Sequence, residues 1–430
     1  MPDELTRRDF LRKSTATFAV ALGAAATDML NIAPAFGANE RIIVGQVGCG
    51  GMGHADSNLF RANPDVQIAA VCDVDRNRLE EGVGWTGGKA KGYSDFRQLI
   101  DRKDLDAVLV TTPDHWHCLP TVYACESGKD VYCEKPLATS IGEGRAMVNA
   151  ARRYGRVVQM GTQQRSGAHF QHAVEMVRSG AIGRVTMART WNCSNETVDN
   201  MGYPADGDPP PGVDYDMWLG PAPLRAFNPN RFHYSWRWFF DYANGMLGDW
   251  GVHLIDIIMW GMNASAPLSV CAAGGKFAVN DNRDTPDTME VVHEFPGFIH
   301  TYSLRKANEA PLDGTHGYGM QFHGSKATLF VDREGWELIP EPESGLQPQK
   351  GGGSAQNEPH VRNFLDCVKS RQRPICDVEV GFRTTVACIL GNISYLTGRK
   401  LYWDAAAERV TNDPEANRYL TRPYRAPWRL

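Results

Sequence analysis

Short apolar runs alternate with stretches of helical periodicity over residues 41–162. Each run is brief, is bounded by polar or turn residues, and has the length of a buried strand. The predicted strands are residues 42–44, 66–72, 106–112, 131–133 and 156–160. Ser140 and Glu143 open one of the intervening helices with the spacing of a capping box. This alternation predicts a doubly wound parallel sheet with right-handed crossovers, an α/β domain over residues 38–162.

The pattern changes after Gly161 to strands that are paired through short turns. Residues 288–295 and 298–305 flank a Pro-Gly turn, and residues 318–323 and 327–331 flank a Gly-Ser turn. Such pairs are typical of antiparallel hairpins. The sequence therefore predicts a second domain over residues 163–430, of the α+β class with an antiparallel sheet.

The end of this second domain contains one weakly patterned stretch. Residues 341–359 are rich in Pro, Gly and Gln, which predicts a loop or linker. Helices are expected at residues 359–369 and 381–396, and a further strand at residues 336–339.

Residues 1–37 are predicted to be an export signal with its processing region. Residues 6–12, Thr-Arg-Arg-Asp-Phe-Leu-Arg, resemble the twin-arginine signal, and an uncharged apolar stretch follows at residues 14–27. Small residues then offer cleavage after Ala35 or Gly37. A retained transmembrane anchor is the alternative, although the stretch is short for a span. We expect the twin-arginine translocase to export the protein to the periplasm.

The composition of the chain argues against two kinds of site, a nucleic-acid surface and a metal site built from cysteines. A formal net charge of −5 argues against a nucleic-acid surface. The ten cysteines include no C-x-x-C pair, so reduced and buried thiols are expected rather than a metal site.

A glycine-rich turn follows the first predicted strand. Gly48, Gly50 and Gly53 fit the G-x-G-x-x-G pattern, in which glycines form a tight turn, admit a pyrophosphate and pack a helix on a strand. The second strand ends in Asp73, where a carboxylate would bind ribose hydroxyls and favour NAD. Arg76 and Arg78 follow closely and leave NADP possible. The alternative is a glycine-rich turn beside an unrelated aspartate.

Candidate chemistry also follows two later strands of the first domain. Glu134 and Lys135 come directly after the strand at residues 131–133, at the sheet edge where parallel sheets bind ligands. Lys135 is placed to hold a substrate oxygen and to ease loss of its proton, unless it is a solvated lysine before a turn. His115 and His117 lie after another strand, and helix capping is as good an explanation for them.

The stretch from Gly248 to Asp256 is the second candidate site. On an α-helix Asp249, His253 and Asp256 share one face, because they are spaced i, i+4 and i+7. His253 is the natural general base for a hydroxyl proton, and a carboxylate one turn away would orient its ring. A buried structural Asp–His pair is the alternative. No metal is expected, because convincing third and fourth ligands are missing.

Aromatic residues gather between these sites. Residues 191–242 hold twelve Phe, Trp or Tyr, more than twice the chain average of 10%. Flat rings beside polar side chains suit sugar faces, and Trp236 is one candidate. Ordinary core packing and a subunit interface explain any single ring equally well.

Together these motifs resemble the Gfo/Idh/MocA oxidoreductases, from about residue 41 to the end of the chain. The motifs that carry the resemblance are Gly48–Gly53, Thr112-Pro113, Glu134–Leu137, Gly161–Arg165 and Gly248–Asp256. The resemblance implies a Rossmann domain, a second domain with a large open sheet often used for oligomerisation, and a homodimer or homotetramer. It also implies Lys135 and His253 as a catalytic pair that Asp249 assists.

The resemblance completes two sets of candidate residues. The cofactor set is Gly48, Gly50, Gly51, Met52, Gly53, Asp73, Thr112, Pro113, His117, Glu134 and Lys135. The substrate set is Lys135, Gln163, Arg165, Trp236, Asp249 and His253.

The expected function is that of an exported NAD(P)-dependent oxidoreductase with a tightly bound cofactor. Its substrate would be a hydroxyl of a sugar, glycoside or cyclitol. One alternative is an NAD-dependent glycosidase or lyase that acts through a transient keto-sugar. A further alternative is a non-catalytic sensor of sugar or cofactor that keeps the fold.

Overall fold

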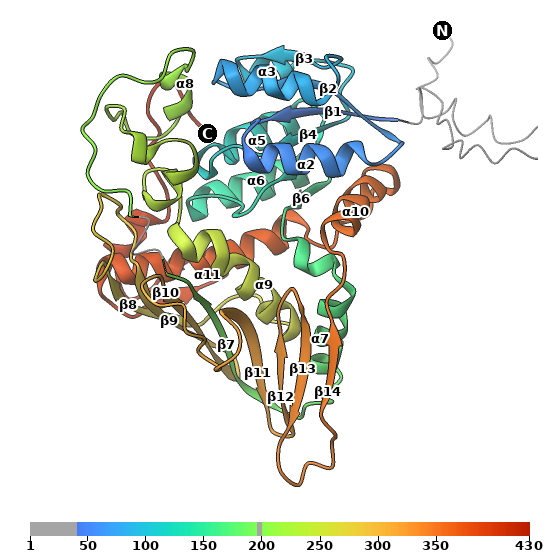
Figure 1. Ribbon diagram of the computed structural model, residues 1–430, viewed down its shortest axis with the longest axis vertical. Helices are drawn as coiled ribbons and strands as arrows, with labels where there is room; N and C mark the ends of the chain where they lie inside the picture. Colours follow the sequence, from blue (N-terminus) through green and yellow to red (C-terminus); the bar gives the residue numbers. More distant parts are fainter. Residues whose placement is uncertain (1–40, 196–199) are drawn as a thin grey trace, which may run out of the picture.

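The computed structural model describes residues 41–195 and 200–430, which form two sheets with helices around and between them (Figure 1). The predicted signal at residues 1–37 lies outside the described residues. Within the described chain, no helix combines the length and apolar character that crossing a bilayer requires.

The first sheet is parallel and has the order β3-β2-β1-β4-β5-β6. Its strands are β1 (Ile42–Val47), β2 (Val66–Cys72), β3 (Lys91–Tyr93), β4 (Ala107–Val110), β5 (Asp130–Cys133) and β6 (Val158–Met160). Helices cover both faces, which explains why the strands are apolar runs without alternation. The predicted doubly wound α/β fold is confirmed, and the order is that of a Rossmann domain.

The helices of this domain connect successive strands. They are α2 (Gly51–Arg61), α3 (Arg76–Trp85), α4 (Phe96–Ile100), η1 (Asp114–Trp116), α5 (Cys118–Glu126) and α6 (Ile141–Arg153). The capping box of α6 is confirmed, since Glu143 accepts a hydrogen bond from the Ser140 N–H at 2.9 Å and donates its own N–H to the Ser140 hydroxyl.

The second sheet has ten strands in the order β14-β13-β12-β11-β7-β10-β9-β8-β15-β16. Only the β7–β10 pairing is parallel, and the expected hairpins β9–β10 and β11–β12 are confirmed. The strands are β7 (Val185–Cys193), β8 (Ser269–Gly275), β9 (Thr288–Phe295), β10 (Phe298–Arg305), β11 (Tyr318–Gly324), β12 (Ala327–Val331), β13 (Gly335–Pro340), β14 (Gln349–Gly352), β15 (Leu401–Asp404) and β16 (Arg409–Val410).

One face of this sheet packs against helices, and the two that come later in the chain lie between the two sheets (Figure 1). The helices are α7 (Ala168–Arg178), α9 (Val252–Gly261) and α11 (Val378–Thr397). Shorter helical segments lie in the connections of the chain. They are η2 (Gln163–Ser166), α8 (Tyr215–Leu219), η3 (Pro229–Arg231), η4 (His233–Trp238), η5 (Leu247–Gly251) and η6 (Ala416–Tyr419).

The prediction of a loop over residues 341–359 is wrong in part. Strand β14 lies within it and pairs with β13, and helix α10 (Asn357–Ser370) begins before its end. One of the glycines that suggested a loop is needed in the strand. A Cβ on Gly351 would lie 2.4 Å from the indole nitrogen of Trp336, so this edge strand requires glycine for close packing.

Helix α10 returns to the first domain, although the sequence placed everything after residue 162 in the second. Phe364 packs edge-to-face on Phe60 and Tyr132, with ring centroids 6.0 and 5.8 Å apart. Arg362 binds Asp65 at 3.0 Å. The Rossmann core therefore includes a helix from near the end of the chain (Figure 1).

The cysteines are free thiols, and all except Cys271 are buried. The expectation of reduced, buried thiols at Cys72, Cys125, Cys133 and Cys367 is confirmed. Among the described residues, no cluster of three His, Cys, Asp or Glu side chains could hold a metal ion.

Candidate active site between the two domains

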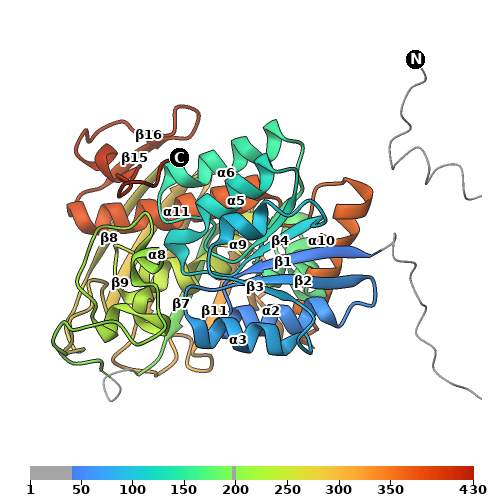
Figure 2. The same ribbon diagram turned by 90° about the horizontal axis from the view of Figure 1, so that it is seen from above.

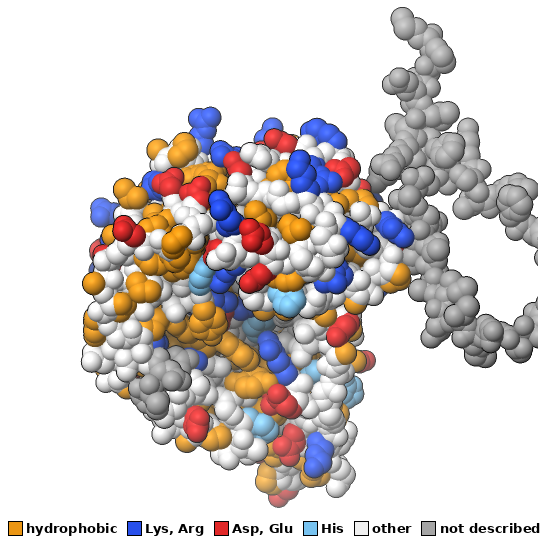
Figure 3. Space-filling model, turned by 45° about the horizontal axis from the view of Figure 1, so that its top comes forward, with side chains coloured by type: hydrophobic (Ala, Val, Ile, Leu, Met, Phe, Trp, Pro, Cys, Tyr) orange, Lys and Arg blue, Asp and Glu red, His pale blue; other side chains and the backbone are white. Residues whose placement is uncertain are grey.

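A cavity of about 400 Å³ lies where the carboxyl ends of the first sheet meet the second domain. Figure 3 shows this face hollowed, with hydrophobic, basic and histidine side chains in the hollow. The predicted residues that line the cavity are Gly48, Gly50, Gly51, Met52, Asp73, Thr112, Pro113, His117, Glu134, Lys135, Trp236 and Asp249. Gly53, Gln163, Arg165 and His253 lie outside its lining.

The glycine turn leaves no room for side chains at its two ends. Gly48 has φ +100°, and a Cβ there would lie 2.6 Å from the Thr111 carbonyl oxygen. A Cβ on Gly53 would lie 2.3 Å from the Gly48 carbonyl oxygen, so Gly53 packs helix on strand as predicted. Thr111 donates its hydroxyl to the Gly48 carbonyl at 2.7 Å. The turn thus has the geometry that a dinucleotide-binding turn requires.

Asp73 is fixed by the backbone at the end of β2. Its carboxylate accepts hydrogen bonds from the N–H groups of Cys49 at 2.8 Å and Asp75 at 2.9 Å. Burial raises the pKa of Asp73, although these hydrogen bonds counteract the shift. Further lone pairs on both oxygens remain for ribose hydroxyls, so the carboxylate fits the role predicted for it.

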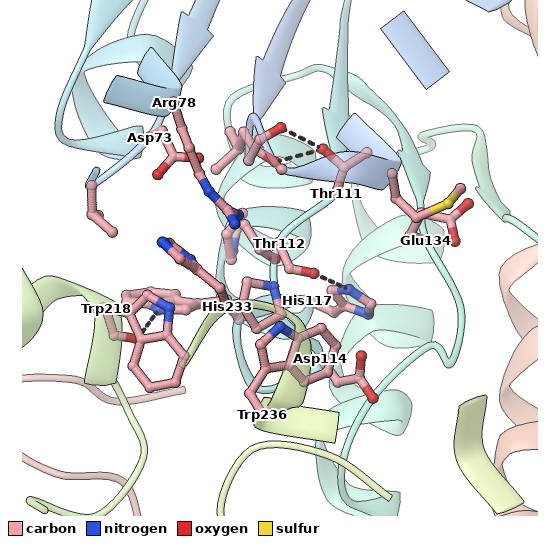
Figure 4. Close-up of a pocket in the computed structure, with 18 of the residues that line it drawn as sticks. Asp73, Arg78, Thr111, Thr112, Asp114, His117, Glu134, Trp218, His233 and Trp236 are labelled. Atoms are coloured by element: carbon pink, nitrogen blue, oxygen red, sulfur yellow. Dashed lines mark hydrogen bonds between the residues drawn. The ribbon is translucent and has the colours of Figure 1, made fainter. Parts of the chain in front are cut away.

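Arg78 is a cation of the cavity that the sequence indicated only as a possible modifier of cofactor choice. A Cβ on Gly50 would lie 2.7 Å from Nη1 of Arg78. No acidic side chain among the described residues lies within ion-pair distance of Arg78. In Figure 4, Arg78 from α3 and His233 from η4 reach into the cavity from opposite sides. The guanidinium therefore stands where a phosphate would approach the turn.

A segment of the second domain closes over this nucleotide side of the cavity. The Arg76 N–H donates to the Gly212 carbonyl at 3.0 Å, and the Asp214 N–H donates to the Val74 carbonyl at 2.9 Å. Nε2 of His233 lies 3.1 Å from a carboxylate oxygen of Asp75. We call residues 212–233 the strap. Figures 1 and 2 both show α8, within the strap, beside α3.

Lys135 is held by Asp249. Its Nζ donates to Oδ1 of Asp249 at 2.7 Å and to the Asp249 carbonyl at 2.9 Å. Nε of Arg237 lies 3.4 Å from the same Oδ1. Burial alone would raise the pKa of Asp249, but the charges of Lys135 and Arg237 outweigh it and hold this pKa below its ordinary value. Asp249 is thus an anion that positions the ammonium group at the cavity wall.

The predicted hydrogen bond between Asp249 and His253 is not formed. Asp249 lies in η5, a π-helical segment that closes i to i+5, so the α-helical spacing does not apply. Nδ1 of His253 is buried without a hydrogen-bond partner in the described chain. Burial, with the charges of Lys135 and Arg333, holds the pKa of His253 well below its ordinary value. The ring is therefore a neutral imidazole near the lysine.

Asp256 and Arg165 are bound to each other instead of facing the cavity. Arg165 donates to both oxygens of Asp256, at 2.6 and 2.8 Å, and the Thr384 hydroxyl donates to Oδ1 at 2.8 Å. Both side chains are buried. Arg165 is therefore bound to Asp256 outside the cavity lining, and its role in substrate binding stays a prediction. Gln163, in the same motif, has its amide oxygen buried without a partner in the described chain.

His117 joins two loops of the site. Its Nδ1 lies 2.7 Å from the Pro136 carbonyl oxygen, and its Nε2 lies 3.0 Å from the Thr112 carbonyl oxygen (Figure 4). Burial lowers the pKa of His117 to about 4. His115 is buried against Trp218, with Nε2 2.9 Å from the Trp218 carbonyl oxygen. The side chain of His117 caps no helix and lines the cavity, whereas His115 packs against Trp218.

Two buried carboxyl groups adjoin Lys135. Burial raises the pKa of Glu134 to about 7, partly offset by the charge of Lys135. Burial also raises the pKa of Asp56, on α2, and the charge of Glu134 adds to this shift. Oε1 of Glu134 and Oδ2 of Asp56 have no hydrogen-bond partner within the described residues. The sequence pattern indicated Glu134 but gave no sign of Asp56.

The aromatic-rich segment contributes rings both to the cavity and to the core. Trp236 and Trp218 line the cavity, whereas Trp191 is buried in the second domain against Phe330. Arg237 stacks on Trp236, with its guanidinium carbon 4.3 Å from the ring centroid. Sequence reasoning missed Arg237 and His233, because nothing in their local pattern marks them as cavity residues.

Models of known protein families match both domains of the chain. A family model described as "Oxidoreductase family, NAD-binding Rossmann fold" matches residues 42–162. One described as "Oxidoreductase family, C-terminal alpha/beta domain" matches residues 191–296 and 339–430. Together the two models cover well over half of the chain.

Two curated relatives match parts of the chain. An inositol 2-dehydrogenase of Rubrobacter xylanophilus is 39% identical over 160 residues, 36% of this chain and 45% of that protein. A glycosyl hydrolase family 109 protein of Solibacter usitatus is 31% identical over 218 residues, 48% of this chain and 49% of that protein. The matched regions thus span about half of the length of these relatives.

Solved structures agree on the fold. Levoglucosan dehydrogenase in complex with NADH and levoglucosan has a TM-score of 0.67 and covers 84% of this chain and 99% of its own. Its sequence identity is 18%, so the likeness supports the two-domain architecture alone.

Proposed function

Because the chain belongs to the Gfo/Idh/MocA oxidoreductase family, whose first domain binds NAD, we propose that it oxidises a hydroxyl group of a sugar, glycoside or cyclitol. The observation that carries this proposal is the Lys135–Asp249 ion pair at the wall of the nucleotide cavity. It sets an oriented ammonium group at the carboxyl edge of the sheet, where a substrate oxygen can bind.

Three residues of the chain have separate roles in removing the hydroxyl proton of the substrate. Lys135 donates a hydrogen bond to the substrate oxygen and stabilises the negative charge that develops on it. His253 is neutral, since its pKa is lowered, and can accept the hydroxyl proton once the substrate lies beside it. Asp249 keeps the lysine in place.

The glycine turn, Asp73 and Arg78 fit a nicotinamide dinucleotide. The turn excludes side chains from the phosphate side, Asp73 offers a carboxylate for the ribose, and Arg78 is a cation without an acidic partner in the described chain. NAD, when bound, supplies the hydride acceptor of the family's chemistry. A preference for NAD over NADP follows from Asp73.

The proposed substrate class is supported by the aromatic rings that line the cavity and by the similarity to known relatives. Trp236 and Trp218 present flat apolar surfaces in the cavity beside charged side chains, a combination that suits sugars and cyclitols. The partial match to an inositol dehydrogenase points the same way.

A second candidate is an NAD-dependent glycosidase that uses the same first step. The match to a glycosyl hydrolase family 109 protein favours it, over 48% of this chain. Oxidation of the hydroxyl two carbons away from the glycosidic carbon would acidify the C–H between them, so that the aglycone could leave by elimination. Water would then add to the double bond, and the hydride would be returned. This candidate predicts aglycone release without net formation of NADH.

Export and assembly complete the proposal. The twin-arginine pattern in residues 6–12 supports transport of the folded protein to the periplasm with its cofactor bound tightly. Exposed apolar side chains on strands of the second sheet, Met187, Val292 and Ile299, support a homodimer or homotetramer.

The deciding experiment identifies the cofactor and then the substrate. The purified protein is denatured, released nucleotide is identified, and the native protein is screened with sugars, cyclitols and aryl glycosides for NADH absorbance and aglycone release. Absorbance gain supports the oxidoreductase, and aglycone release without it selects the glycosidase. Sugar binding without either signal selects a sensor and overturns catalysis.

A further inference from the structure

Arg333 is a partly buried guanidinium without an acidic partner in the part of the chain that the structure describes. It stacks on Trp250, with its guanidinium carbon 4.8 Å from the ring centroid. Its Nε is buried and has no hydrogen-bond partner there. Two other arginines near the site are paired, Arg165 with Asp256 and Arg237 with Asp249.

The turn that carries Arg333 is fixed by hydrogen bonds. It connects β12 to β13, and Asp332 accepts hydrogen bonds from the N–H groups of Glu334 at 2.9 Å and Gly335 at 3.0 Å. The neighbouring carboxylate of Glu334 accepts the Tyr318 hydroxyl at 2.7 Å. Glu334 is thus committed to Tyr318, and the backbone holds Arg333 against Trp250.

Arg333 is connected to the catalytic candidates through its contact with Trp250. Trp250 directly follows Asp249, and its ring packs edge-to-face with His253, with centroids 6.3 Å apart. The positive charge of Arg333 contributes to the lowered pKa of His253, after burial and Lys135. Burial in turn lowers the pKa of Arg333 itself. The guanidinium and the imidazole therefore share one electrostatic environment.

A partly buried cation without a counterion is costly, and a ligand that brings a negative charge removes that cost. The nearby acids are occupied, Asp332 by the N–H groups of Glu334 and Gly335, Glu334 by Tyr318, and Asp249 by Lys135. We propose that Arg333 binds a carboxylate of the substrate, so that the enzyme acts on acidic sugars such as uronic acids rather than on their neutral counterparts. This inference rests on the proposed oxidation of a sugar hydroxyl.

The planar fork of arginine suits a carboxylate, which it binds through two parallel hydrogen bonds. With the carboxylate at Arg333 and a ring hydroxyl at Lys135, the substrate would span the space beside Trp250. Arg333 is then a specificity-determining residue, and it takes no part in the proton transfer.

The test compares matched pairs of sugars on the NAD-loaded protein. D-Glucuronate and D-glucose, and D-galacturonate and D-galactose, are measured for turnover and for binding by calorimetry. We expect the acid of a pair to exceed its neutral partner by roughly 10- to 100-fold in kcat/KM or affinity, the range of a charge-assisted hydrogen bond. Arg333→Met, which keeps the apolar stem on Trp250, should abolish the preference mainly through KM, and Arg333→Lys should restore part of it.

Arg383→Met is the matched control, because Arg383 lies on α11 in an exposed pair with Glu379. It should leave the acid-to-neutral ratio unchanged. Equal use of acid and neutral sugars, or an unchanged ratio in Arg333→Met, overturns the role of Arg333 while leaving sugar oxidation intact. Absence of binding and turnover with every sugar would overturn sugar oxidation and this inference with it.

Discussion

Nζ of Lys135 lies 2.7 Å from Oδ1 of Asp249, and this pair joins the two domains at the cavity wall. Lys135 comes from the end of β5 in the first domain, whereas Asp249 comes from η5 in the second. Both side chains are largely buried, so the attraction between them is only weakly screened by water. The geometry assigns Asp249 to the lysine and not to His253.

This assignment predicts an order of effects on catalysis. Lys135→Ala and His253→Ala should each lower turnover roughly 10²- to 10⁴-fold, the usual range for a lost acid–base group. Asp249→Asn should lower turnover less than Lys135→Ala, since the lysine remains but loses its orientation. Steady-state kinetics measures the order, and calorimetry checks that NAD still binds. Near-normal turnover of His253→Ala would remove the imidazole from the mechanism.

Asp256 should matter for stability more than for chemistry. Its carboxylate is fully buried and neutralises Arg165, so Asp256→Ala leaves an uncompensated buried charge that costs about 3–5 kcal/mol of unfolding free energy. Urea denaturation measures the loss. The double variant Arg165→Met/Asp256→Leu should regain much of it, because both charges are removed.

Asp366→Ala is the control for that experiment. Asp366 pairs with Arg362 at the surface, and an exposed pair contributes at most about 1 kcal/mol. A loss equal to that of Asp256→Ala would contradict the explanation from burial.

The sequence predicted most of the architecture because its signals are local. Apolar runs, the capping box at Ser140 and the glycine turn depend on neighbouring residues, and each appears where the pattern placed it. The return of α10 to the first domain depends on Phe364 meeting Phe60 from about three hundred residues away. No local pattern carries such a contact.

The site was predicted only in part for the same reason. The sequence indicated Lys135 and Asp249 as separate candidates for the site, but the ion pair between them depends on how the two domains pack together. The α-helical spacing gave a wrong expectation for the contact between Asp249 and His253, because a π-helical segment has a different number of residues per turn. Arg333 and Asp56 lie in ordinary-looking stretches, and only burial without partners marks them.

Cofactor choice should respond to Asp73 and Arg78 in different ways. Asp73→Ser removes the carboxylate that repels a 2′-phosphate, so the ratio of NADP to NAD affinity should rise. Arg78→Met should weaken both cofactors roughly 10-fold, because the cation beside Gly50 would bind the phosphates common to them. Fluorescence titration with NADH and NADPH measures both. Tighter binding of NADP by the unmodified protein would contradict the role given to Asp73.

Glu134 predicts a pH dependence of stability. Its pKa is raised from 4.5 to about 7 by burial, so the folded protein holds this proton more tightly than the unfolded chain. The stability that this provides is present at acid pH and is lost as the pH rises from 4.5 to about 7. The stability of Glu134→Gln relative to the unmodified protein should therefore increase over this range, by about 1–3 kcal/mol.

Thermal unfolding of both proteins, without added nucleotide, at a series of pH values measures that difference. Only its change with pH tests the prediction, since a constant offset reflects altered packing. A difference that stays level between pH 4 and 8 would show that Glu134 titrates normally, and one that falls as the pH rises would show that its pKa is lowered instead; either result contradicts the prediction.

Retention of the cofactor is the last prediction, and it joins the predicted export signal to the strap. Free NAD should be scarce outside the cytoplasm, so an exported enzyme needs a cofactor that crosses with it and is restored in place. The strap contacts the nucleotide side through three hydrogen bonds, from Arg76 to Gly212, from Asp214 to Val74, and between His233 and Asp75. These contacts support slow release of the adenosine end.

The purified protein should therefore keep near-stoichiometric NAD(H) after extensive dialysis, when it is denatured and the supernatant is assayed. His233→Ala removes the one side-chain contact of the three, so it should speed cofactor loss roughly 10-fold. Tyr203→Ala is the control, because Tyr203 is an exposed residue that bonds Asn280 outside the strap. Absence of NAD(H) from the dialysed protein would contradict tight retention of the cofactor. Equal loss from both variants would show that the strap does not hold the cofactor, because only one of the two residues belongs to it.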